Sequence, residues 1–247
     1  MKKVYIEVKN KLPVNVDIQN AIDGFEYLGY EPRFYIREDI LSGSVHNLAH
    51  DNMFVGSIDT MTALFKKIDK YPKPIDFPIE VDVAGLLNRK IIKMELNAFI
   101  NLFKATHVPK FVKPVETKLF DGALISKEEH LNYLRGFNNP DVYISDKLDI
   151  VSEHRAYIHK GKLIYCCCYD GDFKIAPDYY YIEDIIKAYK SAPISYTIDV
   201  AILENGMSTI IEVNDFWSIG SYGLKSWDYA QMLLDRYNEI INTNFIE

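Results

Sequence analysis

The sequence has few cysteines, and they are poorly placed for disulfide or metal chemistry. The only three are neighbours, Cys166, Cys167 and Cys168. Neighbouring residues of a strand point to opposite faces, so three in a row do not easily converge on one metal ion. An odd, clustered set is also a poor disulfide framework. We interpret them as small strand residues in a reducing compartment, with redox or metal chemistry as the alternative.

Long hydrophobic runs and an excess of positive charge are missing as well. No apolar run approaches the ~20 residues that span a bilayer, and the start, MKKVYIEVKN, lacks the hydrophobic core of a secretion signal. Lys and Arg number 28 against 35 Asp and Glu, so the formal net charge is −7. This charge disfavours nucleic acid and anionic membranes as partners. We expect a cytoplasmic protein, with a homodimer among the open oligomeric states.

Familiar catalytic histidine patterns are also lacking. His46 and His50 are four residues apart in HNLAH, but no glutamate accompanies them at the HExxH spacing. The other histidines form no pattern that would activate a nucleophile. What the chain does contain is 247 residues of ordinary composition, 48% hydrophobic and 26% charged. That is enough for a sizeable core in one large domain or two small ones.

The first 80 residues predict a small α/β unit. Short apolar runs predict strands at 4–8, 33–36 and 53–55, and helical spacing predicts helices at 14–28 and 58–68. Gly29 is expected to end the first helix and Ser57 to cap the second. The alternation indicates a parallel sheet flanked by helices. Three prolines between Tyr71 and Pro78 indicate a linker, so we expect domains 1–80 and 81–247.

The remaining residues predict an α+β arrangement with mostly antiparallel strands. Expected strands are 110–114, 123–125, 141–145, 150–159, 162–169, 197–203 and 208–213. Expected helices are 94–103, 181–191 and a C-terminal helix from Trp227 to Ile241, within 226–243. A capping box of Ser126 and Glu129 is expected to open one further helix, which would run to Gly136.

The hairpin Thr197 to Val213 brings oxygen ligands together. Asp199 lies on its first strand, and Glu212 and Asn214 end the second. Residues two apart on a strand share a face and are roughly 6.6–7 Å apart along it. Magnesium prefers carboxylate and carbonyl oxygens. The spacing therefore indicates a magnesium site formed by these three residues.

Cationic side chains precede this hairpin. Lys113 stands at the end of a short strand, and Lys118 lies in a loop that could cover a ligand. Both suit phosphate oxygens, and the alternative is a solvated surface lysine. Arg155 shares a strand face with Glu153 and Tyr157. Its guanidinium is expected either to pair with Glu153 or to hold a phosphoryl or carboxylate group.

The chain resembles an ATP-grasp protein in the order of seven segments: KFVKP, KLFDG, VYISDKLDI, SEHRAYI, YTIDVAIL, IIEVND and SIGSYGL. More narrowly, it is similar to the small bacterial and phage clade named for one arginine and two lysines. The resemblance covers about residues 85–224. It implies an α/β pre-grasp domain followed by an α+β ATP-grasp fold, in which two subdomains clamp ATP and magnesium bridges its phosphates.

The resemblance also implies roles for individual residues. Lys113, Lys118 and, more remotely, Arg89 would contact phosphate, while Arg155 would stabilise charge on the γ-phosphate and on an acyl-phosphate. The hinge near 143–147 would hold adenine and ribose through Tyr143, Ile144, Ser145, Asp146 and Asp149; Asp146 or Asp149 would bind the ribose. Magnesium would be held by Asp199, Glu212 and Asn214. Substrate would contact the following loop through Ser218, Gly220, Ser221 and Tyr222.

Such a site supports carboxylate activation. A substrate carboxylate attacks the γ-phosphate, and an amine then displaces phosphate from the acyl-phosphate. We therefore expect a magnesium-dependent ATP-grasp ligase that joins a small-molecule or peptide carboxylate to an amine and releases ADP and phosphate. The alternatives are an ATP-dependent phosphotransferase and a non-catalytic ATP-binding module.

Overall fold

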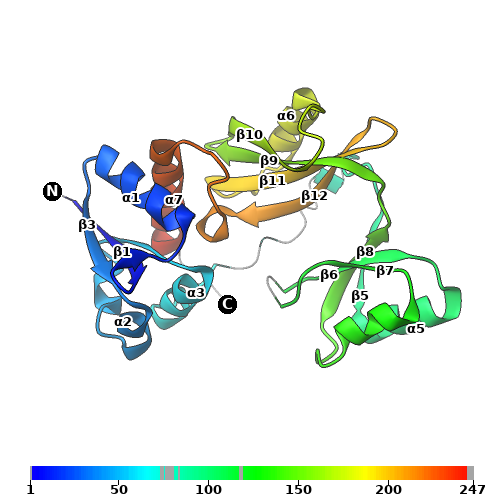
Figure 1. Cartoon of the computed structure of the whole chain (residues 1–247), viewed down its shortest axis with the longest axis horizontal. Helices are drawn as coiled ribbons and strands as arrows, with labels where there is room; N and C mark the ends of the chain where they lie inside the picture. The colour runs from blue at the N-terminus through cyan, green and yellow to red at the C-terminus, as the bar shows by residue number, and fades with distance from the viewer. Residues whose placement is uncertain (1, 73–74, 76–80, 83, 117–118, 244–247) are drawn as a thin grey trace.

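The computed structural model describes residues 2–72, 75, 81–82, 84–116 and 119–243. It contains three sheets, which follow one another along the chain and are covered by helices (Figure 1). The expected α/β unit followed by an α+β fold is confirmed. None of the helices in the described ranges is long and apolar enough to cross a membrane. Most of the expected linker between Tyr71 and Pro78 lies outside the described residues.

The first sheet is parallel at its centre, as predicted. Strand β1 (Lys3–Lys9) pairs in parallel with β3 (Glu31–Tyr35) and β4 (Met53–Val55), and β2 (Leu12–Pro13) adds to β1 in the antiparallel direction. The helical segments of this unit are α1 (Val16–Tyr27), α2 (Arg37–Ser42), η1 (His46–Leu48) and α3 (Ile58–Lys67). Gly29 follows α1 at a φ of 80°, a conformation that favours glycine.

The cap of α3 differs from the prediction. Ser57 occupies the N-cap position, but its hydroxyl donates to Thr60 Oγ1 (3.0 Å) and caps no backbone amide. The buried carboxylate of Glu7 on β1 binds the start of the helix instead: it accepts hydrogen bonds from Ser57 N (2.6 Å) and from Thr60 Oγ1 (2.9 Å). A carboxylate at a helix N-terminus is favourable, and this one ties α3 to the first sheet.

Residues 91–146, which we call the small lobe, form an antiparallel sheet in the order β5-β8-β6-β7. Its strands are β5 (Ile91–Glu95), β6 (Lys110–Pro114), β7 (Ala123–Ile125) and β8 (Asp141–Asp146). Helix α5 (Leu96–Thr106) and the 3₁₀ segment η2 (Glu128–Leu134) share its apolar core, which includes Phe99, Phe103 and Ile144.

Two predictions in the small lobe need correction. The expected helix at 94–103 is present as α5, but it begins at Leu96, because Met94 belongs to β5, a strand that was not predicted. Strand β5 is short and partly exposed, so its pattern does not stand out from the helix that follows it. The capping box of Ser126 is absent from this described segment: Ser126 N donates to His130 Nδ1 (3.3 Å), and η2 follows Lys127.

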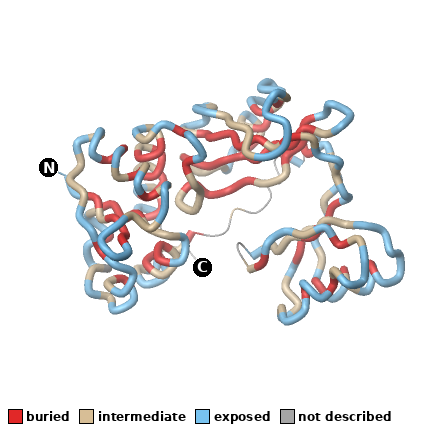
Figure 2. Tube along the Cα trace, viewed as in Figure 1, coloured by how far each residue is buried: buried red, intermediate tan, exposed pale blue. Residues whose placement is uncertain are grey.

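The main sheet is also antiparallel, in the order β10-β9-β11-β12. Its strands are β9 (Ile150–His159), β10 (Lys162–Gly171), β11 (Ser195–Leu203) and β12 (Ser208–Asp215). Helix α6 (Tyr179–Ala188), capped by Asp178, packs on one face over Ala156, Ile158 and Ile198. The buried strands of this sheet are the most continuous part of the core (Figure 2).

The C-terminal helix joins the first unit to the main sheet. Helix α7 (Ser226–Asn242) follows the 3₁₀ turn η3 (Phe216–Ser218) and packs along α1 (Figure 1). One apolar core therefore contains Phe25 of α1, Phe54 of β4, Leu233 of α7 and Tyr157 of β9.

The chain crosses between the main sheet and the small lobe twice. Residues 86–89 run beside β12, where Asn88 Nδ2 donates to Ser208 O (2.8 Å) and Thr209 Oγ1 donates to Leu87 O (2.6 Å). The chain then enters the small lobe at Ile91 and leaves it after Asp146, through residues 147–149. Two short connections thus join the lobe to the rest of the molecule.

Candidate functional site

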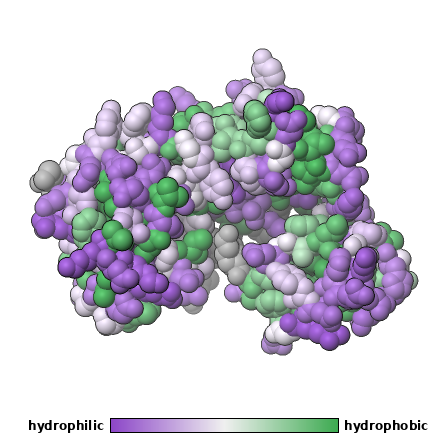
Figure 3. All heavy atoms as spheres, in the orientation of Figure 1, coloured by the Kyte–Doolittle hydropathy of each residue, from purple (hydrophilic) through white to green (hydrophobic). Residues whose placement is uncertain are grey.

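A cavity of about 470 Å³ lies between the small lobe and the main sheet. The space-filling view shows the hollow between these two parts (Figure 3). One wall comes from β6 and β8 of the small lobe, and the opposite wall comes from residues 211–215 of β12. Tyr71, Trp217 and Ser218 close a third side. The residues predicted for the site that line this cavity are Arg89, Lys113, Tyr143, Ser145, Asp146, Asp199, Glu212, Asn214 and Ser218.

Strand alternation decides which residues of β8 face the cavity. Tyr143 and Ser145 line it, whereas Ile144 points to the core of the small lobe. β8 lies between β5 and β6, so the backbone N–H and C=O groups of these residues are hydrogen-bonded to the two neighbouring strands. The connection 147–149 lies outside the ladders and is the better source of backbone groups for a ligand.

The acidic residues near this connection differ in position. Asp146 lines the rim of the cavity, and its carboxylate pairs with Lys110. Asp149 is exposed, pairs with Lys147 (2.6 Å), and is not among the residues that line the cavity. Of the two residues considered for ribose, only Asp146 therefore borders the space where a ligand would lie.

A β-bulge in β12 determines which side chains face the cavity on its acidic wall, the name we give to Asp199, Glu212 and Asn214. Asp199 is paired with Glu212, whereas the next residue of β11, Val200, is paired with Ile210. The extra residue is Ile211, and an extra residue reverses the alternation of side chains along a strand. Ile210 consequently packs in the core under α6, while Glu212 faces the cavity.

Three charged side chains form a row across adjacent strands. Arg155 on β9 is the cross-strand partner of Asp199 on β11, and Asp199 is the partner of Glu212 on β12. Arg155 donates through Nε and Nη2 to the two carboxylate oxygens of Asp199, at 2.8 and 2.7 Å. Across the cavity, Lys113 Nζ lies 3.5 Å from Glu212 Oε1. Two carboxylates thus lie side by side between two cations.

Burial shifts the pKa values of this row. Burial raises the pKa of the Asp199 carboxyl, and the hydrogen bonds from Arg155 oppose that rise. Burial lowers the pKa of Lys113, and the attraction of Glu212 partly offsets the effect. For both groups, the partner therefore favours the charged form that burial disfavours.

The acidic wall fits magnesium by its donor set. Asp199 and Glu212 are directly opposite across two strands, where like charges repel each other and a divalent cation would relieve the repulsion. Asn214 Nδ2 donates to Glu212 Oε2 (3.1 Å), so the amide belongs to the same cluster. Within the described ranges, no group of three His, Cys, Asp or Glu is arranged around a metal position. Two carboxylates and an amide remain, a set to which Mg²⁺ would add water and phosphate oxygens.

Arg89 links the two walls of the cavity. It donates through Nη1 to Ser145 Oγ on β8 (3.2 Å) and through Nη2 to Ile211 O on β12 (3.1 Å). The carbonyl it binds is that of the bulged residue. Burial lowers the pKa of Arg89 to about 10. Arg89 and Lys113 are thus two cations that border one cavity.

Arg155 lies beside the cavity and is not among the residues that line it. Its partner is Asp199, which the sequence interpretation did not consider as a partner. Glu153, the expected partner, instead accepts from the hydroxyl of Tyr169 at 2.6 Å. Residue Lys118 lies outside the described residues.

The loop after η3 places its residues in different surroundings. Ser218 lines the cavity, and its hydroxyl donates to Asp215 O (3.1 Å). Gly220 borders a second, smaller cavity of about 110 Å³ against the first unit. Ser221 is bound to Asp17 of α1, and the ring of Tyr222 lies over Arg155. Among these four residues only Ser218 borders the main cavity.

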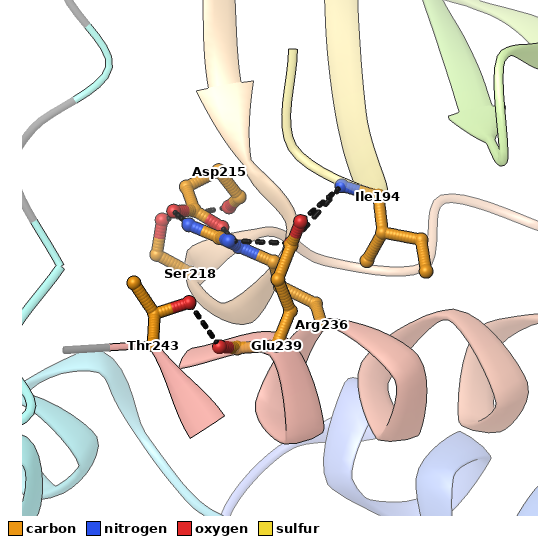
Figure 4. Close-up of polar contacts among 6 residues, drawn as sticks. All are labelled: Ile194, Asp215, Ser218, Arg236, Glu239 and Thr243. Atoms are coloured by element: carbon orange, nitrogen blue, oxygen red, sulfur yellow. Dashed lines mark hydrogen bonds and ion pairs between the residues drawn. The ribbon is translucent and has the colours of Figure 1, made fainter. Parts of the chain in front are cut away.

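Asp215 anchors the end of the acidic wall to α7. Arg236 donates through Nε to Asp215 Oδ1 (2.7 Å) and through Nη2 to Oδ2 (2.5 Å), and Nη1 binds Glu239 (2.6 Å). Glu239 also accepts from Ile194 N, just before β11 (Figure 4). This network fixes Asp215 and the loop after it relative to β11.

Several cavity residues were missed by sequence reasoning. They are aromatic or acidic side chains brought in from separate segments: Tyr71, Glu153, Tyr169, Asp215 and Trp217. A signal existed only for Asp215, because Arg236 interrupts the apolar face of α7 and a buried arginine requires an acidic partner.

One comparison with known proteins identifies the family of this chain. The family model of the ATP-grasp domain, R2K clade family 2, matches residues 86–232, more than half of the chain. Comparison with curated proteins finds no match.

Solved structures with a similar fold include ligases of small molecules and peptides. D-cycloserine synthetase DcsG matches with a TM-score of 0.66 and 12% identity over 95% of this chain and 99% of its own. D-alanine–D-alanine ligase from Bacillus anthracis complexed with ATP matches with a TM-score of 0.56 and 13% identity over 97% of both chains. The ATP-grasp ligase PsnB complexed with a minimal precursor matches with a TM-score of 0.56 and 13% identity, over 98% of this chain and 97% of its own.

Proposed function

Because this chain belongs to the R2K clade family 2 of ATP-grasp domains, we propose that it is an ATP-dependent ligase joining a carboxylate to an amine. One observation carries the proposal: a single cavity has Lys113 and Arg89 as cations and Asp199, Glu212 and Asn214 as oxygen ligands. A nucleoside triphosphate needs both kinds of group, cations for its phosphates and an oxygen site for its metal.

The nucleotide would lie across the cavity, with its base toward the connection 147–149. Tyr143 and Leu148 offer apolar surface there, and Asp146 is the candidate for the ribose hydroxyls. The phosphates would approach Lys113 and Arg89, and we retain Lys118 as a further candidate from the resemblance. Arg89 contacts both walls, so phosphate binding at this position would draw the small lobe and the main sheet together.

Asp199, Glu212 and Asn214 would hold magnesium at the phosphate end. When bound, the ion would supply positive charge next to the phosphate oxygens. In this proposal Arg155 acts on the site indirectly, because its guanidinium donates hydrogen bonds to both carboxylate oxygens of Asp199 and so orients them. Arg155 is therefore a positioning residue.

The side of the cavity near Trp217 and Ser218 is left for the acceptor. A substrate carboxylate placed there would attack the γ-phosphorus, ADP would leave, and an amine would then displace phosphate from the acyl-phosphate. The solved structures of similar fold support a small-molecule or peptide substrate, since they include D-cycloserine synthetase, D-alanine–D-alanine ligase and PsnB with its precursor. The cavity supplies charge and position for this reaction, without a covalent protein nucleophile.

The products test the proposal. Purified protein with Mg-ATP, hydroxylamine and a panel of amino acids and dipeptides should release ADP and phosphate and form a hydroxamate from the acid that is activated. Glu212→Ala should reduce the rate at least ~100-fold, given the ~2.7–4 kcal/mol that one charge-stabilising group typically contributes to a transition state. Release of AMP and pyrophosphate would contradict the proposal.

Two alternatives give different results in the same assay. A phosphotransferase would release ADP but leave a stable phosphorylated product that hydroxylamine does not trap. A non-catalytic nucleotide-binding module would be stabilised by Mg-ATP without releasing ADP. The combination of Arg89 and Lys113 with Asp199 and Glu212 around one cavity favours the ligase over the module.

A further inference from the structure

Two tyrosines surround the guanidinium of Arg155. The guanidinium carbon lies 5.2 Å from the ring centre of Tyr169 and 4.7 Å from that of Tyr222. The two ring centres are 6.1 Å apart in an edge-to-face arrangement. The two rings therefore pack on each other, and both pack on the cation. Contacts of this kind are strongest where the cation is desolvated, and Arg155 is only 8% exposed.

Tyr169 is fixed by the main sheet. It lies on β10, and its hydroxyl donates to Glu153 Oε2 at 2.6 Å. Glu153 in turn lies on β9, two residues before Arg155, on the same face of the sheet. Tyr169 is thus held in place by β9, the strand that carries the arginine, and by its neighbour β10.

Tyr222 reaches the arginine from a loop in an unusual conformation. Its φ is 42°, in the left-handed region that is unfavourable for a bulky residue, and its side chain is half exposed. This is the conformation of a tight turn, because Gly223 follows with a φ of 85° and Leu224 N donates to Ser221 O (2.8 Å). The turn brings the ring of Tyr222 over Arg155.

The loop 219–224 is held from both sides. Ser221 donates to Asp17 Oδ1 of α1 through its backbone N (2.7 Å) and its hydroxyl (2.8 Å). Tyr157 of β9 donates to Gly220 O at 2.8 Å. A Cβ at Gly220 would lie 2.8 Å from Asp17 Oδ2 and 3.1 Å from the ring of Tyr222, so a larger residue there would have to displace one of these side chains.

We propose that Tyr169 and Tyr222 are positioning residues that hold the Arg155 guanidinium in the orientation from which it binds Asp199, with loop 219–224 delivering Tyr222. The inference rests on the proposed function, since Asp199 belongs to that site. The first unit thereby takes part in the chemistry, because Asp17 of α1 fixes the residue next to Tyr222. The segment that follows the acidic wall thus contributes Ser218 to the cavity and Tyr222 to the contact with Arg155.

The first arm of the test measures Arg155 directly and needs no substrate. Tyr222→Leu keeps the bulk and the strained backbone but removes the ring, whereas Tyr222→Phe keeps the ring. The exposed Tyr180, treated as Tyr180→Leu, is the matched control. Hydrogen exchange of the Arg155 Nε–H, assigned by its loss in Arg155→Lys, should accelerate about tenfold in Tyr222→Leu alone, as expected for loss of one desolvated cation–π contact.

The second arm measures turnover. Tyr222→Leu should lower kcat about tenfold and leave the KM for ATP within about twofold, while Tyr222→Phe matches the wild type. An exchange rate within threefold of the wild type, or an unchanged kcat, would overturn the inference. Absence of ADP release by the wild type with the whole acid panel would refute the ligase proposal, and the exchange arm would still decide whether the rings hold Arg155.

Discussion

At the scale of single residues, Lys113 has the most informative surroundings. It stands on the cavity wall of the small lobe, opposite Glu212 of the main sheet, with 3.5 Å between Nζ and Oε1. Burial lowers the pKa of Lys113, and the attraction of Glu212 partly offsets that effect. We infer that this cation, which borders the cavity, is placed to meet a ligand that carries negative charge.

Replacing Lys113 should weaken nucleotide binding. Under the proposed assignment, Lys113→Met would remove a charge-assisted hydrogen bond to phosphate worth ~1.5–3 kcal/mol, so the Kd for ATP should rise roughly 10- to 100-fold. Lys93→Met is the matched control, because Lys93 lies on β5 of the same lobe, pairs with Asp141 and does not line the cavity. Isothermal titration with a non-hydrolysable ATP analogue measures both. Equal losses in the two variants would show that Lys113 has no special role.

At the scale of elements, α7 connects parts of the chain that are distant in sequence. Its Arg236 holds the end of β12, its apolar face packs on α1, and its Asp235 binds the β9–β10 turn. Asp235 accepts from His159 Nε2 at 2.8 Å and from Lys160 Nζ at 2.7 Å. Burial acts to raise the pKa of Asp235, but the bonds from Lys160 and His159 outweigh it and lower the pKa below its ordinary value.

The stabilisation from Asp235 should depend on pH. Its pKa is lower in the folded state, so the contribution is complete above the unfolded-state value of about 3.9 and is lost as the pH falls through the folded-state value. Asp235→Asn should reduce the free energy of unfolding at pH 7 by ~0.5–1 kcal/mol, and the difference should shrink progressively as the pH falls below about 3.9. Urea unfolding over a series of pH values measures it, with the exposed Asp51→Asn as control. A difference that does not change with pH would contradict the ion-pair explanation.

Elements with strong local patterns could be predicted from the sequence. β4, β6 and β7 occupy the expected residues, and the β9–β10 hairpin turns at Lys160 and Gly161, both with positive φ. The small edge strand β5 could not be separated from α5, because one apolar pattern runs into the next. The cap of α3 could not be predicted at all, because its carboxylate comes from Glu7, 50 residues away.

The residue types of the site could be predicted from the sequence. Which side chains share a face and which ones pair with each other could be predicted only in part. The spacing of Glu212 and Asn214 indicates a shared face, and both line the cavity in the structure. Alternation alone would also have put Ile210 on that face, and only the bulge at Ile211 turns it into the core. The partner of Arg155 depends on the pairing of β9 with β11, a long-range contact that no local pattern encodes.

At the scale of the whole molecule, the cavity is formed by two parts, the small lobe and the main sheet, that line it from opposite sides. Arg89 bonds to both walls, and the two connections to the small lobe are short. A ligand that contacts both walls stabilises their closed arrangement, because it binds only where both are in place.

Nucleotide binding should therefore raise the melting temperature, and magnesium should be needed for the full effect. A ligand at 100 times its Kd adds about 2.7 kcal/mol, which corresponds to roughly 5–10 °C for a chain of this size. Differential scanning fluorimetry with an ATP analogue should give this shift with Mg²⁺ and a clearly smaller one with EDTA. Equal shifts under both conditions would contradict the assignment of Asp199, Glu212 and Asn214 to the metal.

The two crossings between the lobe and the main sheet also bear on how such a chain can be altered in evolution. Ile91 enters the small lobe and Ser145 is near its exit, yet the two are paired neighbours on adjacent strands. A segment whose ends meet in this way is an insertion in the topological sense. We expect residues 91–146 to be replaceable as one unit by two crossovers that meet at one place in the structure, while the first unit and α7 keep their common core with the main sheet.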